Sequence, residues 1–160
     1  MALGLIFLWY VILGVLTAGG LIALISKRLT PRSEQAALGL LLIPIAAIYL
    51  VFLAHLGPTA ALRAELLPVI GFALLGLAGT RVAPVLMLGY LGHGAWDLLH
   101  EVLMLQGRLE TLTAIPLAYG MFCATIDWVL AGYCLTRRHD WRAAPRAPRP
   151  VASGLLPDAR

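Results

Sequence analysis

The stretch 92–101, GHGAWDLLHE, gathers the residues of this chain whose types and spacing could do chemistry. His93, Asp97, His100 and Glu101 stand at i, i+4, i+7 and i+8, so a helix would place all four on one face. The surrounding residues are apolar, and an ionisable side chain inside a membrane helix costs roughly 2.5–3.5 kcal/mol on insertion scales. Each of the four therefore needs a partner or a function.

The chemistry that these residue types favour is metal-assisted hydrolysis. Imidazole nitrogens and carboxylate oxygens are suitable ligands for zinc, iron or manganese. Side chains three or four positions apart on a helix can reach one ion, so Asp97 could share an ion with either histidine. Such an ion could activate water against an ester or amide bond of a lipid-soluble molecule. We predict metal ligands at His93, Asp97, His100 and Asp127, and catalytic residues at Asp97, Asp127 and Glu101.

Two other interpretations stay open. In the first, the polar cluster is structural: a hydrogen bond between His93 and Asp127 fixes the register of two helices. The protein would then be a non-catalytic accessory subunit or a small-molecule binder. In the second, the groups pass protons or ions, which would favour titratable residues across the whole bilayer rather than its outer two-thirds.

Further polar and aromatic residues are candidates for a substrate pocket around this cluster. They are His55, Glu65, Tyr90, Trp96, Tyr119, Cys123 and Trp128. Cys123 and Cys134 stand on one apolar segment, roughly 16 Å apart along a helix, which is too far for a disulfide.

The composition indicates the environment of the helices that would position these residues. Of the 160 residues, 61% are hydrophobic and 12% are charged, and the mean hydropathy is +0.88. A soluble domain of this size needs more polar residues to cover its surface. The partners expected are therefore the lipid bilayer and a lipid-like small molecule. A nucleic acid is not expected, because the basic residues behind the +4 charge lie mainly outside the apolar segments.

The apolar segments predict an all-α, polytopic transmembrane bundle. Five spans can be drawn, at about 3–26, 35–55, 60–80, 82–105 and 114–136, each long enough for a bilayer core of roughly 30 Å. Residues 1–136 would form one transmembrane domain. Residues 137–160 are rich in proline, alanine and arginine, and they predict a disordered basic tail.

The basic residues predict the orientation. One side of the five-span topology holds Lys27, Arg28, Arg32, Arg81 and the six tail arginines, and the other holds Arg63 and Arg108. Positive charge accumulates on the cytoplasmic side, so the N-terminus is expected outside and the tail inside, in a bacterial cytoplasmic membrane.

This topology also predicts the depth of each polar group. His55, Glu65, His100 and Glu101 would lie near the outer end, with Asp97 deeper and His93 level with Asp127. The prediction requires spans four and five to be antiparallel neighbours, as their short connection favours.

HGAWDLLHE followed by FCATIDWVLA resembles an uncharacterised family of small bacterial multi-pass membrane proteins. That family pairs a His-x-x-Trp-Asp-x-x-His-His element with a downstream Cys-x-x-x-Asp helix. The matching residues are His93, Trp96, Asp97, His100, Cys123 and Asp127, with Glu101 in place of the second histidine of the pair. The resemblance implies that these residues act as a unit, without implying a reaction.

Overall fold

The structure is a computed structural model that describes residues 2–56, 59–108 and 112–144. The described residues form five α-helices, one short 3-10 helix and no strand, which confirms the all-helical class. The elements are α1 (Ala2–Arg28), α2 (Pro31–Leu56), the 3-10 helix η1 (Thr59–Ala61), α3 (Leu62–Gly79), α4 (Ala83–Leu105) and α5 (Tyr119–Ala143).

Three of the helices, α1, α2 and α3, are long and apolar enough to cross a membrane. Apolar residues face outward along them, among them Leu8, Leu40 and Leu74, which are all more than half exposed. Burying so much apolar surface requires a lipid environment or another apolar partner. The chain therefore has the character of a membrane protein.

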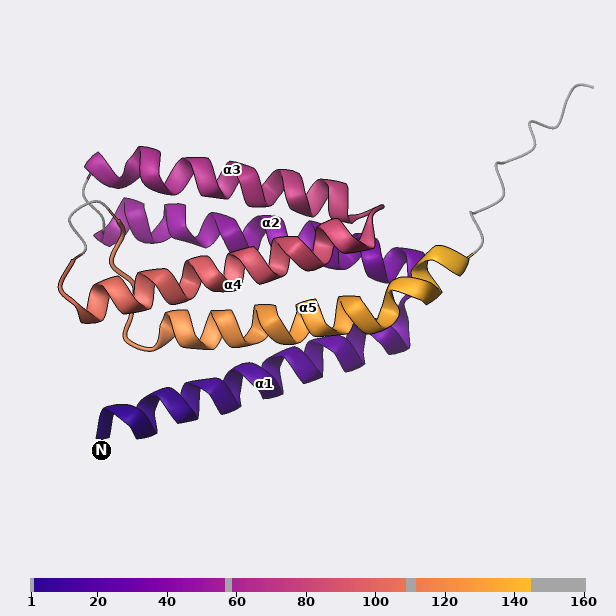
Figure 1. Ribbon diagram of the computed structural model, residues 1–160, viewed down its shortest axis with the longest axis horizontal. Coiled ribbons are helices and arrows are strands. Elements are labelled where there is room, and N and C mark those ends of the chain that lie inside the picture. The colour runs from indigo at the N-terminus through magenta and orange to yellow at the C-terminus, as the bar shows by residue number, and fades with distance from the viewer. Residues whose placement is uncertain (1, 57–58, 109–111, 145–160) are drawn as a thin grey trace, which may run out of the picture.

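The five helices lie side by side with their long axes roughly aligned (Figure 1). α4 packs against α3 on one side and α5 on the other, while α5 also packs against α1. α2 pairs mainly with α3 and also contacts α4 and α5. As a result, one face of α4 is enclosed by α2, α3 and α5, and that face carries the polar residues.

Glycines permit close approach at two helix crossings. A Cβ built on Gly39 of α2 would lie 2.6 Å from the carbonyl oxygen of Gly76 on α3. A Cβ built on Gly120 of α5 would lie 2.5 Å from the carbonyl oxygen of Asp97 on α4. Since any larger residue would push the backbones apart, these glycines set the separation of the helices.

The last helix does not have the bounds that the sequence predicted. Span five was expected at 114–136, but α5 begins at Tyr119, because Ala118 has a left-handed backbone (φ 63°) that a helix cannot contain. α5 then continues to Ala143, so residues 137–143 are helical rather than part of the predicted tail. Trp141 is buried against the core, which explains this extension. The rest of the predicted tail, from residue 145, lies outside the described residues.

Candidate functional site

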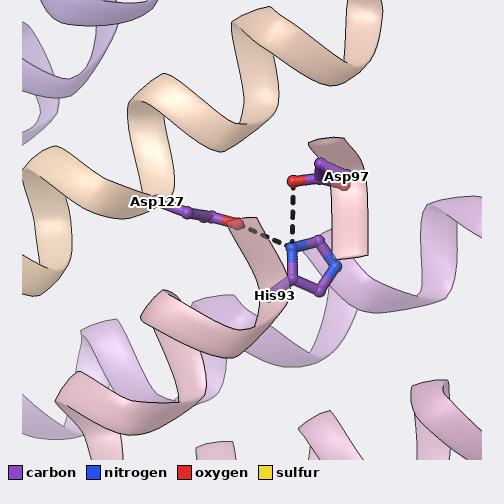
Figure 2. A group of neighbouring side chains, drawn as sticks. All are labelled: His93, Asp97 and Asp127. Atoms are coloured by element: carbon purple, nitrogen blue, oxygen red, sulfur yellow. Dashed lines mark hydrogen bonds and ion pairs between the residues drawn. The ribbon is translucent and has the colours of Figure 1, made fainter. Parts of the chain in front are cut away.

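His93, Asp97 and Asp127 form one buried group between α4 and α5. The i, i+4 spacing places His93 and Asp97 on the face of α4 that packs against α5, where Asp127 lies (Figure 2). His93 Nδ1 lies 2.6 Å from Asp127 Oδ2 and 3.3 Å from Asp97 Oδ2. All three residues are at most 1% exposed. The structure thus brings together three of the four predicted metal ligands.

This group lacks partners for several polar atoms. His93 Nε2, Asp97 Oδ2 and Asp127 Oδ1 are buried without a hydrogen-bond partner in the described part of the chain. The ion pairs found there for the two carboxylates are both with His93. Two ionised carboxylates and one imidazolium still carry a net negative charge. A buried charge without compensation is costly, so binding of a further cation or a proton would stabilise the group.

Tyr49 of α2 belongs to the same site, although the sequence did not indicate it. Its hydroxyl donates a 2.6 Å hydrogen bond to Asp97 Oδ1, and the residue is fully buried. Its ring centroid lies 6.1 Å from that of His93 and 4.4 Å from that of His100. A single tyrosine in an apolar span carries no signal for this role, because only the packing of α2 on α4 aims it at Asp97.

His100 belongs to a separate cluster. Its Nδ1 donates to the carbonyl oxygen of Trp96 at 3.0 Å, and its Nε2 lies 2.9 Å from Glu65 Oε1 on α3. The backbone N–H of Thr113 donates to the same Glu65 oxygen at 2.7 Å. Both ring nitrogens are occupied, so the structure does not bring His100 to the His93 group.

Glu101, a predicted catalytic residue, caps the beginning of α5. One carboxylate oxygen accepts the N–H of Ala118 and the other accepts the N–H of Gly120, both at 2.9 Å. The first turn of a helix leaves unpaired N–H groups and a partial positive charge, which a carboxylate satisfies. The capping contact also explains how the chain accepts the strained turn at Ala118.

Glu65 and His100, which the predicted topology placed near the outer end, are both fully buried. The reason is that they pair with each other across α3 and α4, a contact that residue spacing within one helix cannot indicate.

The other candidate pocket residues divide into two sets. Tyr119 and Cys123 line a cavity beside Asp127. The remaining four lie elsewhere. His55 is exposed and forms a hydrogen bond with the Val51 carbonyl of its own helix. Tyr90 donates a hydrogen bond to the carbonyl of Leu38. Trp96 packs on His100, and Trp128 is 43% exposed. Both cysteines are free thiols, as predicted.

The cavity has a volume of ≈ 320 Å³ and lies between α2 and α5. Its walls are mostly apolar, and Asp127 is the acidic residue in its lining. The lining residues are Leu41, Pro44, Ile45, Ile48, Tyr119, Phe122, Cys123, Ile126 and Asp127. The volume falls in the usual range for small-molecule pockets, roughly 300–1,000 Å³. An apolar molecule in this cavity would therefore lie beside the His93 group.

The donor set of the His93 group fits a divalent transition metal. Each of the three side chains offers one nitrogen or oxygen atom as a ligand, and these three atoms all lie within 4.8 Å of one another. Ligand bonds of about 2.0–2.2 Å place neighbouring donor atoms of one tetrahedral ion roughly 3–3.5 Å apart. The two observed separations from His93 Nδ1, 2.6 and 3.3 Å, are close to that spacing.

These features define a class: an all-helical protein with three helices long and apolar enough to span a membrane and with a buried histidine–aspartate group. The sequence model of a protein family of unknown function, DUF6010, matches residues 9–140, and the chain belongs to this family. The match agrees with the resemblance to an uncharacterised family. No curated protein and no solved structure matches the chain.

Proposed function

We propose that all five helices cross the membrane, with the N-terminus outside and the C-terminus in the cytoplasm of a bacterial cell. α4 and α5 have 23 and 25 residues, which is enough to span a bilayer. The ionisable residues of α4 and Asp127 of α5 are buried in the bundle, while exposed positions such as Leu88, Leu99 and Leu135 are apolar. The basic residues support the orientation, since ten of twelve fall on the side assigned to the cytoplasm.

Within this bundle, the His93 group binds one divalent transition metal, zinc, iron or manganese. The observation that carries the proposal is the buried group of one imidazole and two carboxylates on His93, Asp97 and Asp127, whose ligand atoms lie within 4.8 Å of one another. A divalent cation would satisfy these donors and offset the excess negative charge together. Tyr49 orients Asp97 from outside the group, as outer partners of metal ligands commonly do.

The reaction that fits this site is hydrolysis of a lipid-soluble molecule. The bound ion would supply activated water, and the apolar cavity would hold the substrate beside Asp127. Asp127 is the residue that both belongs to the metal group and faces the cavity, so it would act as ligand or general base.

One observation favours a second candidate, a non-catalytic accessory or binding protein. The 2.6 Å hydrogen bond from His93 to Asp127 joins α4 and α5, and such a bond can serve to fix their register. In that case the group would bind a proton rather than a metal.

Metal analysis of the purified full-length protein separates the two. We expect about one ion per chain in the wild type and a loss of most of it in Asp97→Asn and Asp127→Asn. His55→Ala is the matched control, because His55 is exposed and bonds only its own helix among the described residues. If the wild type binds none of the three metals in stoichiometric amount while keeping its helix content, the metal proposal fails and the structural one stands.

A further inference from the structure

A second pocket lies at the opposite end of the bundle from Glu101. Three segments meet there: the beginning of α2, the junction between α3 and α4, and the end of α5. The pocket has a volume of ≈ 200 Å³. Its lining consists of Arg32, Gln35, Arg81, Val82, Ala83, Pro84, Trp141 and Arg142.

Three guanidinium groups, each from a different segment, border this pocket. Arg32 is anchored by hydrogen bonds from Nε and Nη2 to the carbonyl oxygen of Ala144, at 3.1 and 2.9 Å. Arg81 and Arg142 are exposed side chains on the facing segments. Because like charges held together repel one another, the arrangement favours an anion between them.

The segments that carry the arginines are tied to one another. Gln35 Nε2 donates to the carbonyl oxygen of Gly79 at 2.8 Å, which joins α2 to the end of α3. Trp141 is 2% exposed and donates to Glu34 Oε2 at 3.1 Å, which joins α5 to α2. These bonds hold the pocket in shape without using the guanidinium groups of Arg81 and Arg142.

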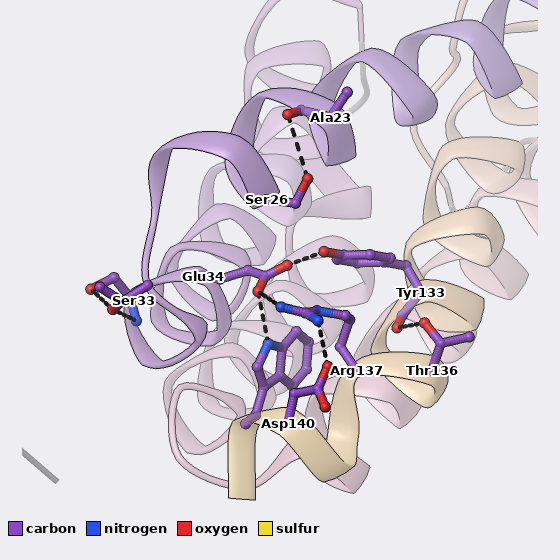
Figure 3. Close-up of polar contacts among 10 residues, drawn as sticks. Ala23, Ser26, Ser33, Glu34, Tyr133, Thr136, Arg137 and Asp140 are labelled. Carbon is purple, nitrogen blue, oxygen red and sulfur yellow. Dashed lines mark hydrogen bonds and ion pairs between the residues drawn. The ribbon is translucent and has the colours of Figure 1, made fainter. Parts of the chain in front are cut away.

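The nearby carboxylates are already paired with another cation. Glu34 accepts from Arg137, Tyr133 and Trp141, and Asp140 accepts from Arg137 as well (Figure 3). α4 also begins at the pocket, at Ala83, so the positive end of its dipole adds to the same field. Among the described residues, the charge balance around the pocket is therefore positive.

We propose that the pocket bordered by Arg32, Arg81 and Arg142 binds a phosphate group. Guanidinium groups bind phosphate through paired N–H donors, which gives arginine its advantage over lysine at such sites. The pocket lies where the apolar helix α2 begins and the apolar helix α3 ends, the level at which lipid headgroups are found. An anionic phospholipid and a free phosphate share this chemistry.

Native mass spectrometry of the full chain in neutral detergent tests the proposal. The protein would be titrated with phosphatidylglycerol, with phosphatidylcholine, and with phosphatidylglycerol in the presence of inorganic phosphate. Arg81→Gln and Arg142→Gln are the test variants. Arg138→Gln is the matched control, because it removes one charge from the same end of α5 at a position that does not line the pocket. Circular dichroism would verify that all variants keep their helix content.

We expect each test variant to weaken phosphatidylglycerol binding roughly fivefold and Arg138→Gln to leave it nearly unchanged. Phosphatidylcholine should bind more weakly than phosphatidylglycerol to the wild type. Competition by inorganic phosphate would identify a free phosphate as ligand, and its absence would identify a headgroup; either supports a phosphate site. The proposal is overturned if the three variants bind alike, whether all unchanged or all equally weakened. Because no residue of the metal group is altered, either result leaves the proposed function untouched.

Discussion

Glu34 at the beginning of α2 and the Asp97–Asp127 pair between α4 and α5 are all buried carboxylates, but their charges are balanced differently. Glu34 is paired with Arg137, a permanently charged guanidinium, at 3.0 Å. Both of its oxygens accept hydrogen bonds. Asp97 and Asp127 share one histidine, and each keeps an oxygen without a hydrogen-bond partner.

The difference separates a structural contact from a candidate site. A buried carboxylate with a matched cation and filled acceptors joins two helices and has no capacity left for a ligand. Two buried carboxylates that share one histidine cost stability unless a further cation or a proton binds. The Glu34 cluster therefore explains how the end of α5 is held on α2, whereas the proposed metal ion would supply the positive charge that the aspartate pair lacks.

The largest expected effect on stability comes from removing Arg137, the cation that pairs with Glu34. Arg137→Met should lower the free energy of unfolding by about 3 kcal/mol, because Glu34 would remain buried without its charge partner. Unfolding in mixed detergent with increasing dodecyl sulfate would measure it. Arg138→Met, at an exposed neighbouring position, should change stability by less than about 0.5 kcal/mol. Equal losses in the two variants would contradict the assignment.

Neutralising a carboxylate of the His93 group should change the free energy of unfolding in the opposite direction. In chelator-treated protein, Asp127→Asn should be as stable as the wild type or more stable by about 1–2 kcal/mol, since it removes one of two like charges. The amide oxygen can still accept from His93. Adding metal at 100 times its dissociation constant should stabilise the wild type by about 2.7 kcal/mol and the variant much less. A metal-free variant that is clearly less stable than the wild type would show that the group is a structural pair.

Close packing beside the site can be tested through two glycines of α5. Gly120→Ala should destabilise the protein by about 1–3 kcal/mol and reduce metal binding, because the new methyl group would push on the Asp97 carbonyl. Gly132→Ala is the control: nothing lies within 4 Å of a Cβ built there, so stability should be unchanged or rise by up to about 1 kcal/mol. Thermal unfolding and metal titration of both variants are the measurements, and similar stabilities would argue against the close approach.

The smallest effect distinguishes the two buried tyrosine hydroxyls. Tyr49→Phe should lose roughly 1.5 kcal/mol and weaken metal binding, because Asp97 would lose the bond that orients it. Tyr90→Phe removes a bond to the carbonyl of Leu38 and should lose a similar or smaller amount of stability without changing metal affinity. Metal affinity, measured by calorimetry, is the deciding readout; equal affinities in both variants would remove Tyr49 from the site.

Spacing along the helices predicted which residues of the His93 group lie close together. The i, i+4 pair of His93 and Asp97 faces a neighbouring helix, and Asp127 lies level with His93 because α4 and α5 are antiparallel neighbours. Contacts between distant segments were not predictable in this way. Glu65 meets His100, Glu101 caps α5, and Tyr49 reaches Asp97, each across a helix interface. No periodicity in a single segment encodes which faces of two helices will meet.

By itself, the sequence determined that this protein is helical, apolar over membrane-crossing lengths, and polar along one face of α4. Those properties follow from local composition and the 3.6-residue period of the helix. Only the tertiary structure decided which of the polar residues share a site. Packing of α2, α3 and α5 around α4 placed His100 and Glu101 in contacts that occupy them and left the His93 group short of partners. The physical reason is that satisfying a buried polar atom depends on neighbours in space, which a helical pattern does not specify.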